Sequence, residues 1–82
     1  MRLTIIPTDG TVIIDGKAYS NLDLSSIDTT VNAVQWYDTQ GEVELKDPTT
    51  GNMTGHRLIT SVDEFQTAID LWQAAEQNAM NK

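Results

Sequence analysis

The sequence predicts an α+β fold in which a small antiparallel β-sheet of about four to five strands, built from hairpins, is covered by one C-terminal α-helix. Two observations carry this prediction. Residues 41–46 alternate apolar and polar side chains, which is the period of a half-buried strand, and before a short turn residues 33–37 place Val34 and Trp36 on one side. Residues 62–79 instead place apolar side chains every three or four positions, which is the period of a helix.

Size and composition limit what this chain can be. It has 82 residues, no cysteine and a formal net charge of −7 at pH 7. We expect one domain over residues 1–82, with the hairpin sheet in 1–59, a loop at 20–30 and an amphipathic helix at 61–80. Scattered Lys and Arg residues argue against nucleic-acid binding, because phosphate contacts need clustered positive charge. No stretch is apolar for long enough to suggest a membrane span or a signal peptide, so we expect synthesis in the cytoplasm and no membrane partner.

The N-terminal part of the chain predicts a first group of hairpins. Residues 3–6 are rich in β-branched side chains and end at a proline, and residues 7–10 are turn formers that lead into a second strand at 11–14. Asp15-Gly16 is typical of a type I′ turn, so residues 17–19 should fold straight back. The apolar run at 12–14 fits either a strand buried on both sides or one placed against an interface.

The segment 20–30 is polar and rich in capping residues, which indicates a connecting loop. Leu22, Leu24 and Ile27 interrupt it, and we expect them to reach into the core. Turn residues at 47–52 then precede a last, weaker strand at 53–59, which contains a glycine.

The central hairpin divides its side chains between two faces. Val34, Trp36, Val43 and Leu45 are expected in the core. Tyr37 follows Trp36 in the strand and must point to the opposite face. With Glu42 and Glu44 it forms a candidate protein-binding surface, the alternative being an amphipathic ring that rests on the end of the hairpin.

The helix carries an N-terminal signature, in which Ser61 caps it and Glu64 completes a capping box. Its apolar stripe predicts contact with the sheet, and we expect Trp72 to meet Trp36 in the core. The stripe consists of Val62, Phe65, Ala68, Ile69, Trp72, Ala75 and Ala79. Leu71 widens this stripe, either as part of a broad core contact or as an edge that faces a protein partner.

Chemistry-bearing patterns are missing from the sequence. The single histidine, His56, has no Gly-x-Ser-x-Gly nucleophile motif to serve, and neither a His-Glu-x-x-His zinc motif nor a calcium loop occurs. The Asp-Gly pairs mark turns, since neither a Gly-rich strand-to-helix junction nor a Walker lysine follows them. We therefore predict a protein that is not an enzyme, with no catalytic residue, no cofactor and no metal ligand.

Several segments together resemble a family of small tailed-bacteriophage proteins that are encoded near tail-fibre genes and often labelled tail assembly chaperone or tail-fibre assembly protein. The resemblance covers nearly the whole chain. It rests on residues 5–7 with 9–10, on 12–16, 22–25, 33–37, 41–44 and 47–48, and on 59–61 with the helix after them.

This resemblance implies a non-enzymatic accessory protein that binds another phage protein in tail or tail-fibre assembly, in the cytoplasm of the infected bacterium. It implies no catalytic residue. Two alternatives stay open. One is a minor structural protein that forms a homo-oligomer or decoration in the virion, and the other is a small inhibitor of a bacterial defence system.

Overall fold

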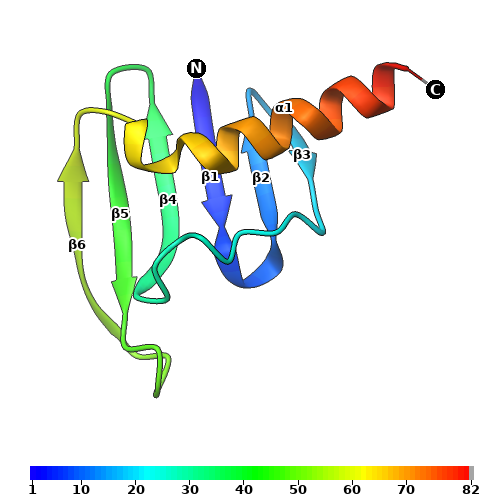
Figure 1. Ribbon diagram of the computed structural model, residues 1–82. Coiled ribbons are helices and arrows are strands. Elements are labelled where there is room, and N and C mark those ends of the chain that lie inside the picture. The colour runs from blue at the N-terminus through cyan, green and yellow to red at the C-terminus, as the bar shows by residue number, and fades with distance from the viewer. Residues whose placement is uncertain (82) are drawn as a thin grey trace.

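The computed structural model, which describes residues 1–81, contains a six-stranded antiparallel sheet and a C-terminal helix that crosses one of its faces (Figure 1). The predicted α+β class is confirmed, with slightly more strands than expected. The strands are β1 (Arg2–Ile6), β2 (Thr11–Ile14), β3 (Lys17–Tyr19), β4 (Val31–Tyr37), β5 (Gln40–Lys46) and β6 (Met53–Ile59). Two short 3-10 turns, η1 (Pro7–Asp9) and η2 (Asp63–Phe65), precede β2 and helix α1 (Gln66–Met80) respectively.

The sheet joins two three-stranded meanders in the order β3-β2-β1-β4-β5-β6. Tight two-residue turns close two of the hairpins, β2–β3 and β4–β5. Asp15 and Gly16 both have positive φ, 50° and 87°, as a type I′ turn requires. The β4–β5 turn is shorter than residues 38–41 suggested, because Gln40 and Gly41 already pair with β4 and only Asp38 and Thr39 stay outside the strands.

One face of the sheet supplies most of the core. Leu3 lies opposite Ile14 on one side and Trp36 on the other, and Ile5 lies opposite Val12 and Val34 in the same way. The buried cluster comprises Leu3, Ile5, Val12, Ile14, Leu24, Val31, Val34, Trp36, Val43, Ile59, Phe65, Ala68 and Ile69. The expected core positions of the central hairpin are therefore confirmed, with Leu45 only partly buried.

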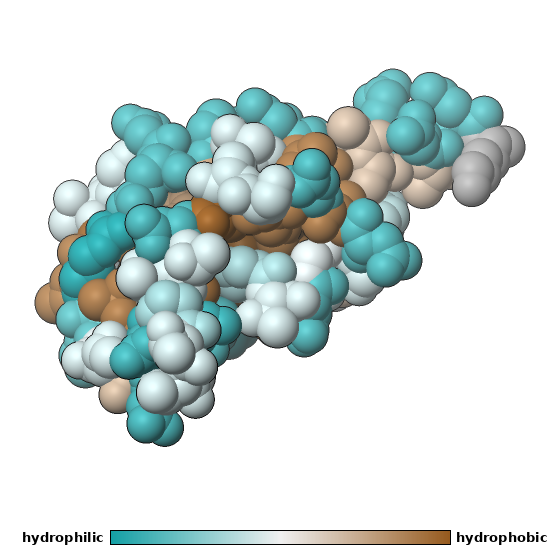
Figure 2. All heavy atoms as spheres, turned by 60° about the horizontal axis from the view of Figure 1, so that its bottom comes forward, coloured by the Kyte–Doolittle hydropathy of each residue, from teal (hydrophilic) through white to brown (hydrophobic). Residues whose placement is uncertain are grey.

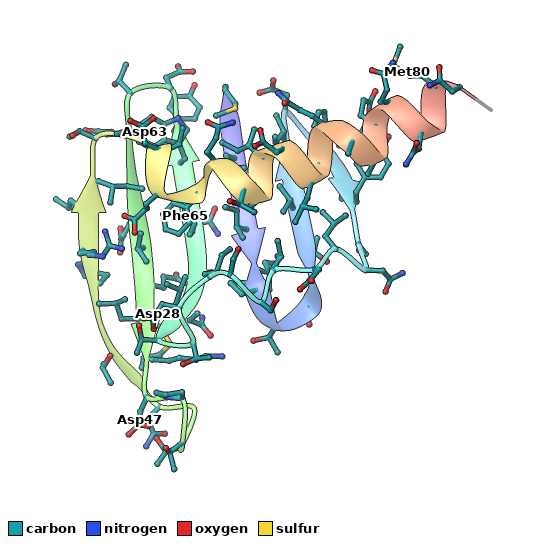
Figure 3. All side chains as sticks on the ribbon, in the orientation of Figure 1. Asp28, Asp47, Asp63, Phe65 and Met80 are labelled. Atoms are coloured by element: carbon teal, nitrogen blue, oxygen red, sulfur yellow. The ribbon has the colours of Figure 1, made fainter. Side chains whose placement is uncertain are left out.

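Helix α1, turn η2 and the 20–30 loop form the layer that covers this face (Figure 1). Figure 3 places Phe65 at the start of the helical segment, and its side chain is buried in the core. In the loop, Leu24 is buried, and Leu22 and Ile27 pack against the core, as expected. Gly10 permits this packing, because a Cβ there would lie 2.7 Å from the carbonyl oxygen of Leu22.

The predicted helix start is wrong in two respects. The α-helix begins at Gln66, after the 3-10 turn η2, and the oxygen of Ser61 accepts a hydrogen bond from the backbone N–H of Asp63 at 3.1 Å. Glu64 forms no capping box. Its two carboxylate oxygens accept hydrogen bonds from Arg57 at 2.7 and 2.8 Å, because Arg57 projects from β6 toward the covered face.

The expected contact between Trp72 and Trp36 is also wrong. The ring of Trp72 packs edge-on against Tyr19, with 5.7 Å between ring centroids, and its Nε1 donates a 2.8 Å hydrogen bond to the carbonyl of Lys17. Trp36 lies on β4, opposite Leu3 and Gly41. The helix crosses the sheet toward β3, so this turn of its apolar stripe lies over the β3 edge and not over the central hairpin (Figure 1).

Candidate functional site

The face of the sheet opposite α1 is the candidate site, and we call it the open face. Helix α1 and the 20–30 loop both lie on the other side, and no helix in residues 1–81 covers this one (Figure 1). The strand register defines a row across it: Ala18, Ile13, Thr4, Gln35, Glu42 and Leu58. Its centre is polar, and Thr4 Oγ1 donates a 3.1 Å hydrogen bond to Gln35 Oε1. An uncovered antiparallel sheet face is expected to be polar at its centre, because it meets water.

A hollow of about 560 Å³ lies on this side, near the β4–β5 turn. Arg2, Gln35, Tyr37, Glu42 and Leu58 are among the residues that line it. The exposed fractions of Tyr37 and Leu58 are 64% and 79%, the two largest values for hydrophobic residues within this hollow. The hollow therefore combines an aromatic ring, an aliphatic side chain and charged groups at one place.

The N-terminus stiffens the rim of the hollow. The terminal ammonium of Met1 donates a 3.0 Å hydrogen bond to Asp38 Oδ1, and the N–H of Asp38 donates to the carbonyl of Met1 at 2.9 Å. Arg2 lies opposite Tyr37 in the strand register. These contacts tie β1 to the turn that carries Tyr37, so the aromatic side chain stands on a fixed backbone.

Glu42 and Glu44 flank a histidine on the open face. His56 lies opposite Glu44 in the register, and its Nδ1 is 3.3 Å from Glu42 Oε1. Asn32 Nδ2 also donates to Glu44 Oε2 at 3.4 Å. This arrangement places two carboxylates beside the imidazole ring of His56.

Several other carboxylates accept hydrogen bonds from backbone N–H groups in turns. Asp28 Oδ1 accepts hydrogen bonds from the hydroxyl and N–H of Thr30, which hold the pKa of Asp28 below its ordinary value. Asp23 makes the same pair of contacts with Ser25, with the same effect on its pKa. Asp47 accepts a bond from the N–H of Thr49 in the turn before β6 (Figure 3). Asp residues in this pattern stabilise local turns.

Two further ionic clusters attach the helical layer to the covered face. Glu76 of α1 accepts hydrogen bonds from the hydroxyl of Tyr19 at 2.6 Å and from Lys17 Nζ at 3.0 Å. These bonds lower the pKa of Glu76, and the bond to Glu76 raises the pKa of both Lys17 and Tyr19. The hydrogen bonds between Arg57 and Glu64 likewise lower the pKa of Glu64. Each of these pKa shifts therefore arises from a hydrogen bond that joins the helical layer to the sheet.

The structure separates the four residues singled out from the sequence. Tyr37, Glu42 and Glu44 do share the open face, as the alternation predicted. Leu71 lies on the helix, half-buried and packed against the core, which fits the broad core contact rather than a free edge. It contributes nothing to the open face.

Sequence reasoning missed Leu58 and Arg2, although a signal for Leu58 existed. In the strand 53–59, Leu58 must point away from the face that Ile59 occupies. The glycine in that strand made its alternation look weak. Of the two alternatives for residues 12–14, burial on both sides is wrong, because Ile13 is only half-buried on the open face, opposite Thr4.

Within residues 1–81, no group of three or more His, Cys, Asp or Glu side chains is placed to hold a metal ion. None of the helices in the described part of the chain is both long and apolar enough to cross a membrane. Comparison with protein-family models, with curated proteins and with solved structures finds no match to this chain. Its functional interpretation therefore rests on the open face and on the resemblance described above.

Proposed function

We propose that this chain is a non-enzymatic bacteriophage accessory protein that binds another phage protein, a tail or tail-fibre component, through the open face of its sheet. The observation that carries the binding role is the pairing of Tyr37 and Leu58, both strongly exposed, around one hollow. Exposed aromatic and aliphatic side chains in a concave, fixed site are typical anchors of protein interfaces. The phage assignment rests on the sequence resemblance.

The surrounding charges set the kind of partner surface that fits. Glu42 and Glu44 lie beside the hollow, and the chain as a whole carries a net charge of −7. Complementary charge accelerates and orders encounter between proteins, so the partner surface should combine an apolar projection with Lys or Arg residues. Arg2, at the rim, adds one group that would pair with a carboxylate of the partner.

An affinity capture from cells infected with the encoding phage tests this function. The wild-type chain should retain a tail or tail-fibre protein, and the Tyr37→Ala variant should lose it, because truncation removes the aromatic anchor. Met80→Ala is the matched control, since Met80 is as exposed as Tyr37, at 69%, but lies at the far end of α1 (Figure 3). Equal capture by both variants would refute the open face as the binding site.

Two other measurements separate this proposal from its alternatives. Mass spectrometry of purified virions should find the chain absent or far below the copy number of the tail proteins. A stoichiometric amount would instead support the structural virion protein. Expression of the gene alone, in a host that carries defence systems, should leave the growth of an unrelated phage unchanged, whereas rescue of that phage would support the inhibitor.

A further inference from the structure

The two edges of the sheet are protected to very different degrees. An unpaired edge strand offers its free N–H and C=O groups to other chains, and proteins usually protect such edges with short strands, lysines or prolines. Edge strand β3 has three residues, including Lys17, and α1 reaches across it through Glu76. Edge strand β6 has seven residues and contains neither lysine nor proline. A bulge interrupts the start of this strand, and Arg57 points toward the covered face, but from Gly55 to Ile59 the strand pairs with β5 in regular register. The β6 edge is therefore less protected than the short β3 edge.

The backbone of β6 is arranged to accept another strand. The N–H of Lys46 points from β5 toward the β4 side, where it donates to the carbonyl of Thr30, whereas the next N–H, of Asp47, bonds toward the β6 side. Since the direction of the backbone groups alternates along an antiparallel strand, the N–H and C=O groups of Val43 and Gly41 in β5 point toward β6. Their register partners Arg57 and Ile59 use their backbone groups within the sheet. The groups of His56 and Leu58 therefore point outward.

The open-face side chains of β6 also lack a covering layer. Two of the five strongly exposed large hydrophobic residues, Met53 and Leu58, belong to this one strand. Figure 2 shows hydrophobic residues at the left edge of the molecule, which is the β6 side in Figure 1. A partner strand placed along β6 would satisfy the outward backbone groups and would lie beside both side chains, which leaves the open-face side of Leu58 toward the hollow.

The distribution of charge favours a second copy of this chain as the partner at the β6 edge. Residues 48–62, which include all of β6, are the longest stretch of the sequence without Asp or Glu, in a chain that carries twelve such residues. A second copy of an acidic chain is repelled wherever carboxylates face one another. At this edge the nearest open-face carboxylates, Glu42 and Glu44, lie one strand further in, and Glu64 is neutralised by Arg57.

Spacing makes the remaining repulsion small. In an antiparallel β6–β6 pair centred on His56, the Glu44 side chains of the two copies would be separated by three strand spacings, about 14 Å, and the Glu42 side chains by more. This distance exceeds the Debye length of about 8 Å at physiological ionic strength. At the β3 edge, in contrast, the Asp15 carboxylate lies in the edge hairpin itself, while Glu76 beside it is neutralised by Lys17. The β6 edge is where two copies can meet at the lowest electrostatic cost.

We propose that the chain forms a homodimer in which the β6 strands of two copies pair antiparallel about a two-fold axis near His56, which extends the sheet across both copies. A two-fold axis perpendicular to the sheet keeps both helices on one side. It also places both open faces on the other side, so the dimer presents two copies of the hollow to the same partner surface. The dimer does not depend on the proposed phage function, because it follows from the edge alone.

Sedimentation equilibrium over a wide concentration range tests the dimer. The mass should rise from 9.1 kDa toward twice that value, and a mass that stays at 9.1 kDa up to millimolar concentration would overturn the proposal. Amide hydrogen exchange then locates the contact. The amides of His56 and Leu58 should become protected as concentration rises, whereas Arg57 and Ile59 should be protected throughout. If the amide exchange rates of His56 and Leu58 stay unchanged while the dimer forms, the proposal is equally overturned.

A pair of proline variants compares the two edges directly. Leu58→Pro removes an N–H that no bond within the sheet uses, and it should weaken dimerisation by at least about tenfold. Ala18→Pro is the matched control on β3, where the two-residue turn at Asp15-Gly16 makes the Ala18 N–H point outward in the same way. A dimer weakened by Ala18→Pro and not by Leu58→Pro would place the contact on the wrong edge. If Leu58→Pro unfolds the chain, Leu58→Lys, which keeps the N–H but adds an edge charge, should weaken the dimer in its place.

Discussion

The aromatic residue that anchors the helical layer should be Phe65 and not Trp72, and this ranking is measurable. Phe65 is 3% exposed and belongs to the core cluster, so Phe65→Ala leaves a cavity and should cost about 3–5 kcal/mol. Trp72 is half-buried at the β3 edge, so in Trp72→Ala water can fill part of the space that the ring leaves. Loss of its hydrogen bond to Lys17 and its ring contact with Tyr19 should cost about 2 kcal/mol.

Urea unfolding followed by far-ultraviolet circular dichroism separates the two values, because it reports the sheet and helix in both variants. A chain of this size has a total stability of about 4–12 kcal/mol, so Phe65→Ala should remove a large fraction of it. Met80→Ala is the control and should leave the midpoint unchanged, because Met80 is exposed at the end of α1. A larger loss for Trp72→Ala than for Phe65→Ala would refute the placement of the helix across the sheet.

Three further changes test other contacts. Gly41→Ala should cost about 1–3 kcal/mol in urea unfolding, because its Cβ would lie 2.6 Å from the Gln35 carbonyl oxygen and 2.9 Å from the Trp36 ring. Gly51→Asn, in open space, should cost much less. Glu64→Gln should flatten the loss of stability in acid: Arg57 lowers the pKa of Glu64, so the pair stabilises the fold above the unfolded-state pKa and is lost as pH falls through the folded-state pKa. The effect should stay below about 1 kcal/mol, because the side chains of Arg57 and Glu64 are 44% and 48% exposed. Glu76→Ala should speed amide exchange in the last turn of α1 and leave exchange in β4 unchanged, since Glu76 is what binds that part of the helix to β3.

The hairpins were predictable because short-range signals decide them. Asp15-Gly16 fixes a two-residue turn, so the strands at 11–14 and 17–19 end where the sequence indicated. The same holds for the strand at 53–59, which the turn residues before it delimit. Side-chain alternation then assigned Tyr37, Glu42 and Glu44 to one face.

Contacts between elements distant in sequence were not predictable in the same way. The helical stripe tells which side chains of α1 face the sheet, but not the direction in which the helix crosses it. Trp72 therefore met Tyr19 and not Trp36. Glu64 satisfied the pattern of a capping box, yet the stronger bidentate bond with Arg57 on β6 took its carboxylate.

The size of the chain explains why one face of the sheet stays uncovered. It does not explain why two side chains on that face are large and apolar. One 15-residue helix, about 22 Å long, matches the width of six strands, about 24 Å, so it can cover one face of the sheet only. A face left to water needs no more than the polar centre that Thr4, Gln35 and Glu42 supply. Tyr37 and Leu58 add exposed apolar area that the fold does not use. Leu58→Thr should accordingly leave stability within about 0.5 kcal/mol, as for other surface substitutions. If stability is unchanged while capture of the partner or dimerisation is lost, the leucine serves binding, and a loss of stability comparable to that of Phe65→Ala would show instead that the open face is part of the core.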